Sequence, residues 1–233
     1  MMTQPGLRLH YAPDNASLCV RLALEELGLD YETTLLDRRQ KAQKQPAYLA
    51  LNPNGLIPVL ETPDGALYET GAILLWLADR YGGGLMPDVQ DNGRGAALKW
   101  LFWLSNTLHA QMRMLFYPEQ YIDGDEQGDA LRSHTRTRLR VQLDLLATAT
   151  DARWLDSTQP SAQGCYLAAL LRWPSLYGGP SDWYQLQDWP RLLAFAQRTE
   201  ARPASLRSAI AEELGATPFS APQPANPANG SAI

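Results

Sequence analysis

The stretch that decides the fold reads Leu49-Ala50-Leu51-Asn52-Pro53-Asn54-Gly55-Leu56-Ile57-Pro58-Val59-Leu60, followed by Asp64-Gly65 and Tyr68-Glu69-Thr70-Gly71-Ala72-Ile73-Leu74. The apolar residues over 56–61 predict a strand. The turn Pro63-Asp64-Gly65 then predicts a paired strand over 66–68. A helix follows, with Thr70 predicted as its cap. The local order is therefore strand, strand, helix.

Upstream of this stretch, strand and helix signals alternate. Residues 7–11 have period-two hydrophobicity and predict a strand, and residues 18–27 predict a helix that stops at Gly28. Residues 31–36 predict a second strand, and a short helix runs through Tyr48-Leu49. The sequence thus predicts a small α/β domain over 1–84 with the order β-α-β-α-β-β-α.

The rest of the chain carries only helical signals. Residues 85–92 are predicted to be a linker, and residues 93–215 an all-helical domain with helices over 96–117, 129–149, 165–173 and 192–200. After Glu213 the chain has no charged residue and contains Pro218, Pro222, Pro224 and Pro227. This composition predicts a disordered tail over 216–233, with a loosely docked tail as the alternative.

Composition excludes several classes of function. The 233 residues have a net charge of −5, which gives nucleic acid no electrostatic attraction. No apolar run approaches the roughly 18 residues of a membrane helix, and the start lacks the features of a signal peptide. The two cysteines and three histidines are scattered and form no metal-binding pattern. We therefore expect a cytoplasmic protein with no metal, no membrane partner and no nucleic-acid partner.

The quoted stretch resembles the glutathione S-transferase family, and the helical half agrees. Trp100-Leu101 through Leu108-His109 is similar to the fourth helix of bacterial members, and Thr199-Glu200-Ala201-Arg202-Pro203-Ala204 to the Arg-Pro near their C-terminus. The resemblance covers about residues 7–214 and points to bacterial beta-like or theta-like members of the serine type. It implies a thioredoxin-like domain followed by a helical domain, glutathione as co-substrate, a homodimer and a role in detoxification.

The resemblance also implies a glutathione site. A cis peptide bond at Ile57-Pro58 turns the Ile57 backbone outward to pair with the tripeptide, whereas an ordinary trans proline on an edge strand is the alternative. Glu69 suits the ammonium group of the γ-glutamyl end. The Thr70 hydroxyl and N–H, at a helix start, suit its carboxylate. Alternatively, Thr70 is only a helix cap and Glu69 a favourable first-turn acid.

Ser17 is the candidate that activates the thiol, because members that use serine place a hydroxyl at this helix start. The alternative is that Ser17 only caps the helix, and Asn15 is a second candidate donor in the same loop. Beta-like members often have cysteine just before this serine, but here the residue is Ala16. We therefore expect no mixed-disulfide or thiol-dependent reductase chemistry at this position.

The second-substrate pocket is expected at His109, Arg113, Tyr117 and Tyr166. His109 aligns with a cleft histidine of beta-like members, although a half-buried structural histidine is equally compatible with the pattern. The tryptophans of the second half are expected in the core. Arg38, Arg39 and Lys41 are the cations near the expected position of the glycine carboxylate of glutathione. The alternative is that these three side chains form only a run of solvent-exposed charges.

The family's sixth helix usually begins S/T-x-x-D, whereas this chain has Ser161-Ala162-Gln163-Gly164. The serine of this capping box is kept and the acid is missing. For function, we expect a glutathione transferase that conjugates the glutathione thiolate to small, electrophilic, apolar substrates. The alternative is a non-catalytic relative that acts as a binding or regulatory module.

Overall fold

The first half of the computed structural model is a four-stranded mixed sheet with helices on both faces. The structure describes residues 6–179, 181–227 and 229–231. The elements of this half are β1 (Leu7–Tyr11), α1 (Ser17–Leu27), β2 (Tyr31–Leu35), α2 (Pro46–Leu49), β3 (Val59–Thr62), β4 (Gly65–Tyr68) and α3 (Thr70–Tyr81). The predicted order β-α-β-α-β-β-α, a thioredoxin-like arrangement, is confirmed.

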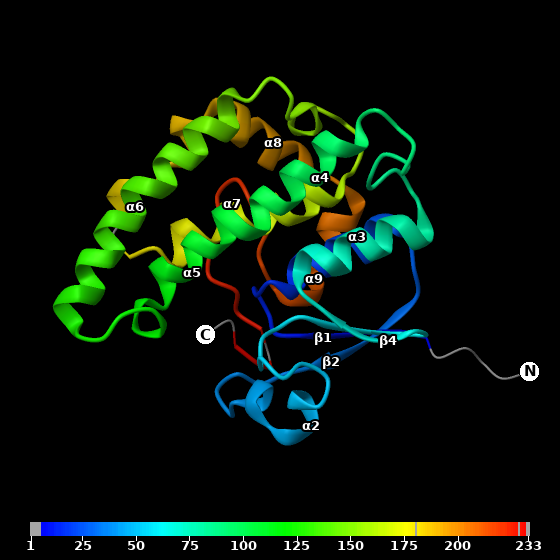
Figure 1. Cartoon of the computed structure of the whole chain (residues 1–233), viewed down its shortest axis with the longest axis horizontal. Coiled ribbons are helices and arrows are strands. Elements are labelled where there is room, and N and C mark those ends of the chain that lie inside the picture. Colours follow the sequence, from blue (N-terminus) through cyan, green and yellow to red (C-terminus); the bar gives the residue numbers. More distant parts are fainter. Residues whose placement is uncertain (1–5, 180, 228, 232–233) are drawn as a thin grey trace, which may run out of the picture.

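The strand order in the sheet is β2-β1-β3-β4. β1 pairs in parallel with β2, through Leu9 opposite Thr33, and antiparallel with β3, through Leu9 opposite Leu60. β3 begins at Val59 rather than at residue 56, because the chain reaches the sheet only after the cis peptide bond Ile57-Pro58. In Figure 1 the sheet lies between α2 on one side and α3 and α9 on the other.

The second half is all-helical, as predicted. Its helices are α4 (Arg94–Trp103), α5 (Ala110–Phe116), α6 (Asp125–Thr148), α7 (Ala162–Tyr177), α8 (Pro190–Glu200) and α9 (Pro203–Glu212). A π-helical turn, Leu104–His109, joins α4 to α5 without a break, so the helix predicted over 96–117 contains a local change of winding. None of the described helices is both long enough and apolar enough to span a bilayer.

One hydrophobic core runs through both halves. α1 is buried along most of its length, from Ser17 to Leu24, and packs against α3, α7 and α9. The same core contains Leu18 of α1 and Leu167 and Leu170 of α7. Since this core is continuous, the division of the chain at residues 84 and 93 stays a prediction.

The expected disorder of the tail is wrong for residues 216–227. Phe219 is 1% exposed and belongs to the core. The backbone N–H groups of Phe219 and Ser220 donate to Glu200, and Arg172 donates to the carbonyls of Pro218 and Gln223. In Figure 1 the tail runs in red from α9 past α7 towards the sheet. Residues 228, 232 and 233 lie outside the described residues.

The physical reason is that the tail has no charges or hydrophobic periodicity of its own, and contacts with residues elsewhere in the chain hold it in place. Its backbone carbonyls satisfy the buried Arg172, and its aromatic ring fills a gap between helices. The uncharged, proline-containing sequence of the tail therefore indicates that it forms no helix, but not that it is disordered.

Candidate functional site

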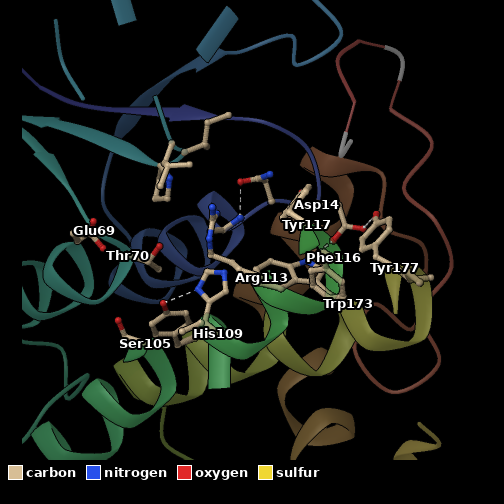
Figure 2. Close-up of a pocket in the computed structure, with 18 of the residues that line it drawn as sticks. Asp14, Glu69, Thr70, Ser105, His109, Arg113, Phe116, Tyr117, Trp173 and Tyr177 are labelled. Carbon is tan, nitrogen blue, oxygen red and sulfur yellow. Dashed lines mark hydrogen bonds between the residues drawn. The ribbon is translucent and has the colours of Figure 1, made fainter. Parts of the chain in front are cut away.

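A cavity of about 580 Å³ opens between the sheet half and the helical half. Its walls come from the loop before α1, the loop before β3, the start of α3, α5, and the second half of α7. Figure 2 shows Glu69 and Thr70 at one end, Phe116, Tyr117, Trp173 and Tyr177 at the other, and His109 and Arg113 between them. The expected site residues that line this cavity are Asn15, Ile57, Pro58, Glu69, Thr70, His109, Arg113, Tyr117 and Tyr166. Ser17 is the exception.

The loop before β3 is held by short-range hydrogen bonds. The Leu56 carbonyl accepts from the Tyr48 hydroxyl at 2.7 Å and from the Asn52 amide at 2.8 Å. Gly55 has φ +60°, and a Cβ there would lie 2.9 Å from the Gln43 carbonyl oxygen. This loop presents Ile57-Pro58 to the cavity with a cis peptide bond, so that prediction is confirmed.

Glu69 stands immediately before α3 with φ 72° and ψ 112°. A non-glycine residue with positive φ is uncommon, and such backbone outliers concentrate at functional sites. Thr70 is the first residue of α3 rather than its cap, and no side chain caps this helix. The prediction that Thr70 caps the helix is therefore wrong. Its N–H and hydroxyl lie at an uncapped helix start, where the partial positive charge attracts a carboxylate.

Ser17 does not reach the cavity. Its side chain is fully buried, and its hydroxyl donates to the Ala12 carbonyl at 3.1 Å. It is the first residue of α1, whose N-cap position is Ala16, so it does not act as a cap either. The hydroxyl is buried at the start of α1, a helix that packs against α3, α7 and α9. The expected contact of Ser17 with a thiol is thus not supported by the geometry.

Asn15 and Ala16 do line the cavity at the start of α1. The Asn15 Oδ1 atom accepts from the Ala16 N–H at 2.9 Å, which leaves the side-chain NH₂ group as a donor. No side chain caps α1. The cavity therefore meets a second uncapped helix start beside an amide donor.

Asp14, the residue before Asn15, is the central acceptor of a buried hydrogen-bond network. The Asp14 carboxylate accepts from Arg172 Nε at 2.8 Å and Nη2 at 3.0 Å, from Trp173 Nε1 at 3.0 Å and from the Tyr177 hydroxyl at 2.5 Å. The Asp14 and Arg172 side chains are both 0% exposed. Asp14 also has φ 51°, and its N–H donates to Glu212. This network fixes the loop that carries Asn15 to α7 and to the tail.

His109 lies at the end of the π-helical turn, and its Nδ1 is joined to the Tyr166 hydroxyl by a hydrogen bond of 2.9 Å. Burial, reinforced by the nearby charge of Arg113, lowers the pKa of His109 to about 4. The ring is therefore neutral at pH 7. Turns of π-helix are frequent at functional sites, and this one turns both Ser105 and His109 towards the cavity.

Tyr166 lies beside the tripeptide end of the cavity. Burial raises the pKa of its hydroxyl far above the ordinary range, while hydrogen bonds from the Ser105 and Thr70 side chains oppose that shift. The hydroxyl therefore stays protonated. Tyr166 is 2% exposed, so it belongs to the wall of the cavity and to the core at once.

The aromatic end contains residues that sequence reasoning missed. Phe116, Trp173 and Tyr177 line the cavity, although the tryptophans were expected only in the core. Trp173 is 4% exposed, so it belongs both to the core and to the wall of the cavity. The signal that could have found this wall is the run of aromatic residues at 116–117 and 173–177, at the ends of two helices. Only the fold brings these two segments together.

The candidate cations for a glycine carboxylate do not line the cavity. Arg38 Nη2 donates to the Tyr117 hydroxyl at 3.2 Å, and its guanidinium lies 6.0 Å from the centre of that ring. Arg39 and Lys41 stand on the exposed loop before α2, outside the residues that line the cavity. Across the described residues, no group of three or more His, Cys, Asp or Glu side chains could hold a metal ion.

Comparison with known proteins assigns the family. Residues 16–80 match the family model for the glutathione S-transferase N-terminal domain. The chain is 30% identical over 213 residues to the glutathione S-transferase GST-4.5 of Xanthomonas campestris pv. campestris, covering 89% of this chain and 98% of that one. It is 26% identical to the disulfide-bond oxidoreductase YfcG of Escherichia coli K12, over 89% of this chain and 96% of that one.

A solved structure supports the same relationship. The chain superposes with a TM-score of 0.73 on a sphingomonad glutathione S-transferase complexed with glutathione, at 27% identity, covering 89% of this chain and all of that one. The sheet order, the cis bond before β3 and the uncapped start of α3 on the cavity agree with this assignment. This chain belongs to the glutathione S-transferase family.

Proposed function

We propose that this protein is a glutathione transferase that joins the glutathione thiolate to small electrophiles with an apolar body. The observation that carries the proposal is the cavity itself. One end combines an acid with positive φ, an uncapped helix start and an outward-facing backbone, and the opposite wall is aromatic. A tripeptide with charged ends suits the first, and an apolar molecule suits the second.

At the tripeptide end, the charged groups of the γ-glutamyl end and the peptide backbone of glutathione each have a protein partner of matching chemistry. Glu69 is the acid for the γ-glutamyl ammonium. The Thr70 N–H and hydroxyl, at the positive end of α3, bind the γ-glutamyl carboxylate. The Ile57 N–H and carbonyl pair with the peptide backbone of glutathione. These three contacts orient the thiol without any metal ion.

The start of α1 activates the glutathione thiol. A free thiol has a pKa near ~8.5, and the thiolate is the nucleophile. Asn15 offers an NH₂ donor, and the uncapped start of α1 adds a partial positive charge. A hydrogen bond to a charged group is worth about 1.5–3 kcal/mol, which is roughly one to two pKa units. We therefore assign the role first considered for Ser17 to Asn15 and the helix start.

The experiment compares Asn15→Ala with Ser17→Ala. Ultraviolet absorbance of the thiolate, measured against pH in the glutathione complex, reports the thiol pKa directly. Asn15→Ala should raise this pKa by about one unit or more, whereas Ser17→Ala should leave it nearly unchanged and lower only the melting temperature. A larger shift in Ser17→Ala than in Asn15→Ala would return the serine to the catalytic role.

The competing reading is a non-catalytic relative that acts as a binding or regulatory module. Retention on immobilised glutathione and turnover of chlorodinitrobenzene with glutathione separate the two, because such a module retains glutathione weakly and forms no conjugate.

We further propose a cytoplasmic homodimer with a role in detoxification. Phe102, on α4, is 54% exposed and is a candidate for burial between subunits. Sedimentation of wild type and Phe102→Ser tests that dimer.

A further inference from the structure

The charges that line the aromatic end of the cavity do not balance. The acidic side chains among the lining residues are Asp14 and Glu69, and the basic one is Arg113. Glu69 lies at the far end, beside Thr70 (Figure 2). Asp14 is neutralised by Arg172, with which it forms a fully buried pair. Neither acid is therefore left to compensate Arg113.

The partners of Arg113 are neutral. Its Nη2 donates to Gln120 Oε1 at 3.0 Å, and its Nε lies 3.4 Å from the Tyr121 hydroxyl. Within the part of the chain that the structure describes, it forms no ion pair, although many of the other arginines do. The guanidinium carries a full positive charge, as arginine side chains do in proteins.

The described neighbours of Arg113 bring no formal negative charge. Its guanidinium lies 5.8 Å from the centre of the Tyr117 ring, and Arg38 donates to the hydroxyl of that ring. His109 is neutral at pH 7, since burial lowers its pKa to about 4. Burial also keeps the Tyr177 hydroxyl protonated by raising its pKa. The fixed charge at this end is thus that of an arginine beside aromatic faces.

We propose that the preferred electrophile is a planar aromatic compound that carries a carboxylate, and that Arg113 binds this carboxylate. The aromatic ring packs among Phe116, Tyr117, Trp173 and Tyr177, and the guanidinium pairs with the anion. This proposal rests on the proposed function, which requires only an apolar electrophile. It adds a charge requirement and assigns it to one residue.

The reaction balances without a further reactant. The thiolate sulfur attacks the ring carbon that bears a halide, a C–S bond forms, the C–halogen bond breaks, and the electron pair leaves with the halide. The thiol proton has already passed to solvent. The carboxylate takes no part in bond making, so Arg113 is a specificity-determining residue.

A matched pair of substrates tests the proposal: a chlorodinitrobenzoate and the corresponding chlorodinitrobenzamide, which has nearly the same shape without the charge. In wild type, kcat/KM relative to the uncatalysed rate should favour the benzoate. Arg113→Met should lower kcat/KM for the benzoate about tenfold, equivalent to about 1.4 kcal/mol, and change that for the benzamide less than threefold. Arg113→Lys should retain part of the preference, and Arg132→Met on α6 controls for a change in overall charge.

A second readout does not depend on turnover. The dissociation constants of the two glutathione conjugates, measured by tryptophan fluorescence, should differ in wild type and converge in Arg113→Met. Equal losses on both substrates, or a tenfold rise in KM for glutathione, would overturn the proposal by placing Arg113 in the tripeptide site or in the scaffold. If neither compound reacts and neither conjugate binds, the proposed function itself fails.

Discussion

The two ends of the cavity are built in different ways. The tripeptide end comes largely from residues 52–70, and its loop before β3 is held by hydrogen bonds between residues four to ten apart, such as Tyr48 and Leu56. The aromatic end joins α5, α7 and the loop before α1, and its central ion pair links residues 158 apart. Local sequence therefore determines the first end, while the second depends on the completed fold.

This difference predicts where each end is vulnerable. Changes at the tripeptide end should alter glutathione binding and leave stability nearly intact, because few core side chains are involved. Changes to the buried Asp14–Arg172 pair behind the aromatic end, and to Phe219, should instead destabilise the molecule, because these residues belong to its core.

Removing the tail after Gly215 should destabilise the protein most. It deletes Phe219, whose burial is worth about 3–5 kcal/mol by comparison with Phe→Ala substitutions. It also removes the two carbonyls that accept from Arg172. Urea denaturation gives the free energy of unfolding, with Phe219→Ala in the full chain as the matched point variant. A loss below about 1 kcal/mol would mean that the tail packs without stabilising.

Arg172→Met should cost about 3–5 kcal/mol, the effect of leaving one buried charge without its partner. The Asp14 carboxylate then keeps the Trp173 and Tyr177 donors but loses its ion pair, so the loop that carries Asn15 is held less firmly. The double variant Asp14→Asn/Arg172→Met should recover part of the loss, because no charge is left unpaired. Additive effects of the two substitutions would show that the pair is not coupled.

Stability should fall in acid partly through His109. Its pKa is lowered to about 4 in the folded state, against about 6.5 when unfolded. Between these values only the unfolded chain takes up the proton, so this contribution is complete above pH 6.5 and is lost as the pH falls towards 4. The loss is at most about 3.5 kcal/mol, from about 2.5 pKa units at ~1.4 kcal/mol per unit.

The measurement is the free energy of unfolding across this pH range in wild type and in His109→Gln, which can still bond the Tyr166 hydroxyl. The variant should lack this part of the pH dependence. Parallel curves for the two proteins would mean that the ring is protonated equally in both states. At pH 7, His109→Gln should change glutathione affinity little, because His109 lies between the two ends rather than beside Glu69 (Figure 2).

Gly164→Asp should have the smallest effect, a stabilisation of about 1 kcal/mol. Ser161 already caps α7, since its hydroxyl accepts from the Gly164 N–H at 3.0 Å. An acid at residue 164 would add the missing half of the box, and replacing a helical glycine is worth about 0.5–1 kcal/mol. A Cβ here would lie 3.1 Å from Ser161 Oγ and 3.6 Å from the Phe195 ring, so the serine must shift slightly. Gly164→Ala separates the backbone effect from the cap, and a fall in melting temperature for both variants would mean that the site has no room.

Sequence patterns predicted the order of elements, since turns, strand periodicity and helix starts depend on the backbone geometry of a few neighbouring residues. The all-helical half could be predicted for the same reason. The cis bond at Ile57-Pro58 and the glutathione-site residues were predicted only through the resemblance to the glutathione S-transferase family. That resemblance placed Ser17 at the cavity wrongly and did not indicate Phe116, Trp173 or Tyr177.

Tertiary contacts determine which way Ser17 faces, that Asp14 pairs with Arg172, and that the tail is ordered. A helix start can face a cavity or the core, and the Ser17 hydroxyl is buried against the Ala12 carbonyl in a helix that packs against α3, α7 and α9. Burial of Arg172 requires acceptors, and these come from Asp14 and from the backbone of Pro218 and Gln223. Such partners are far apart along the chain, and desolvation makes each depend on the other, so no local pattern could reveal them.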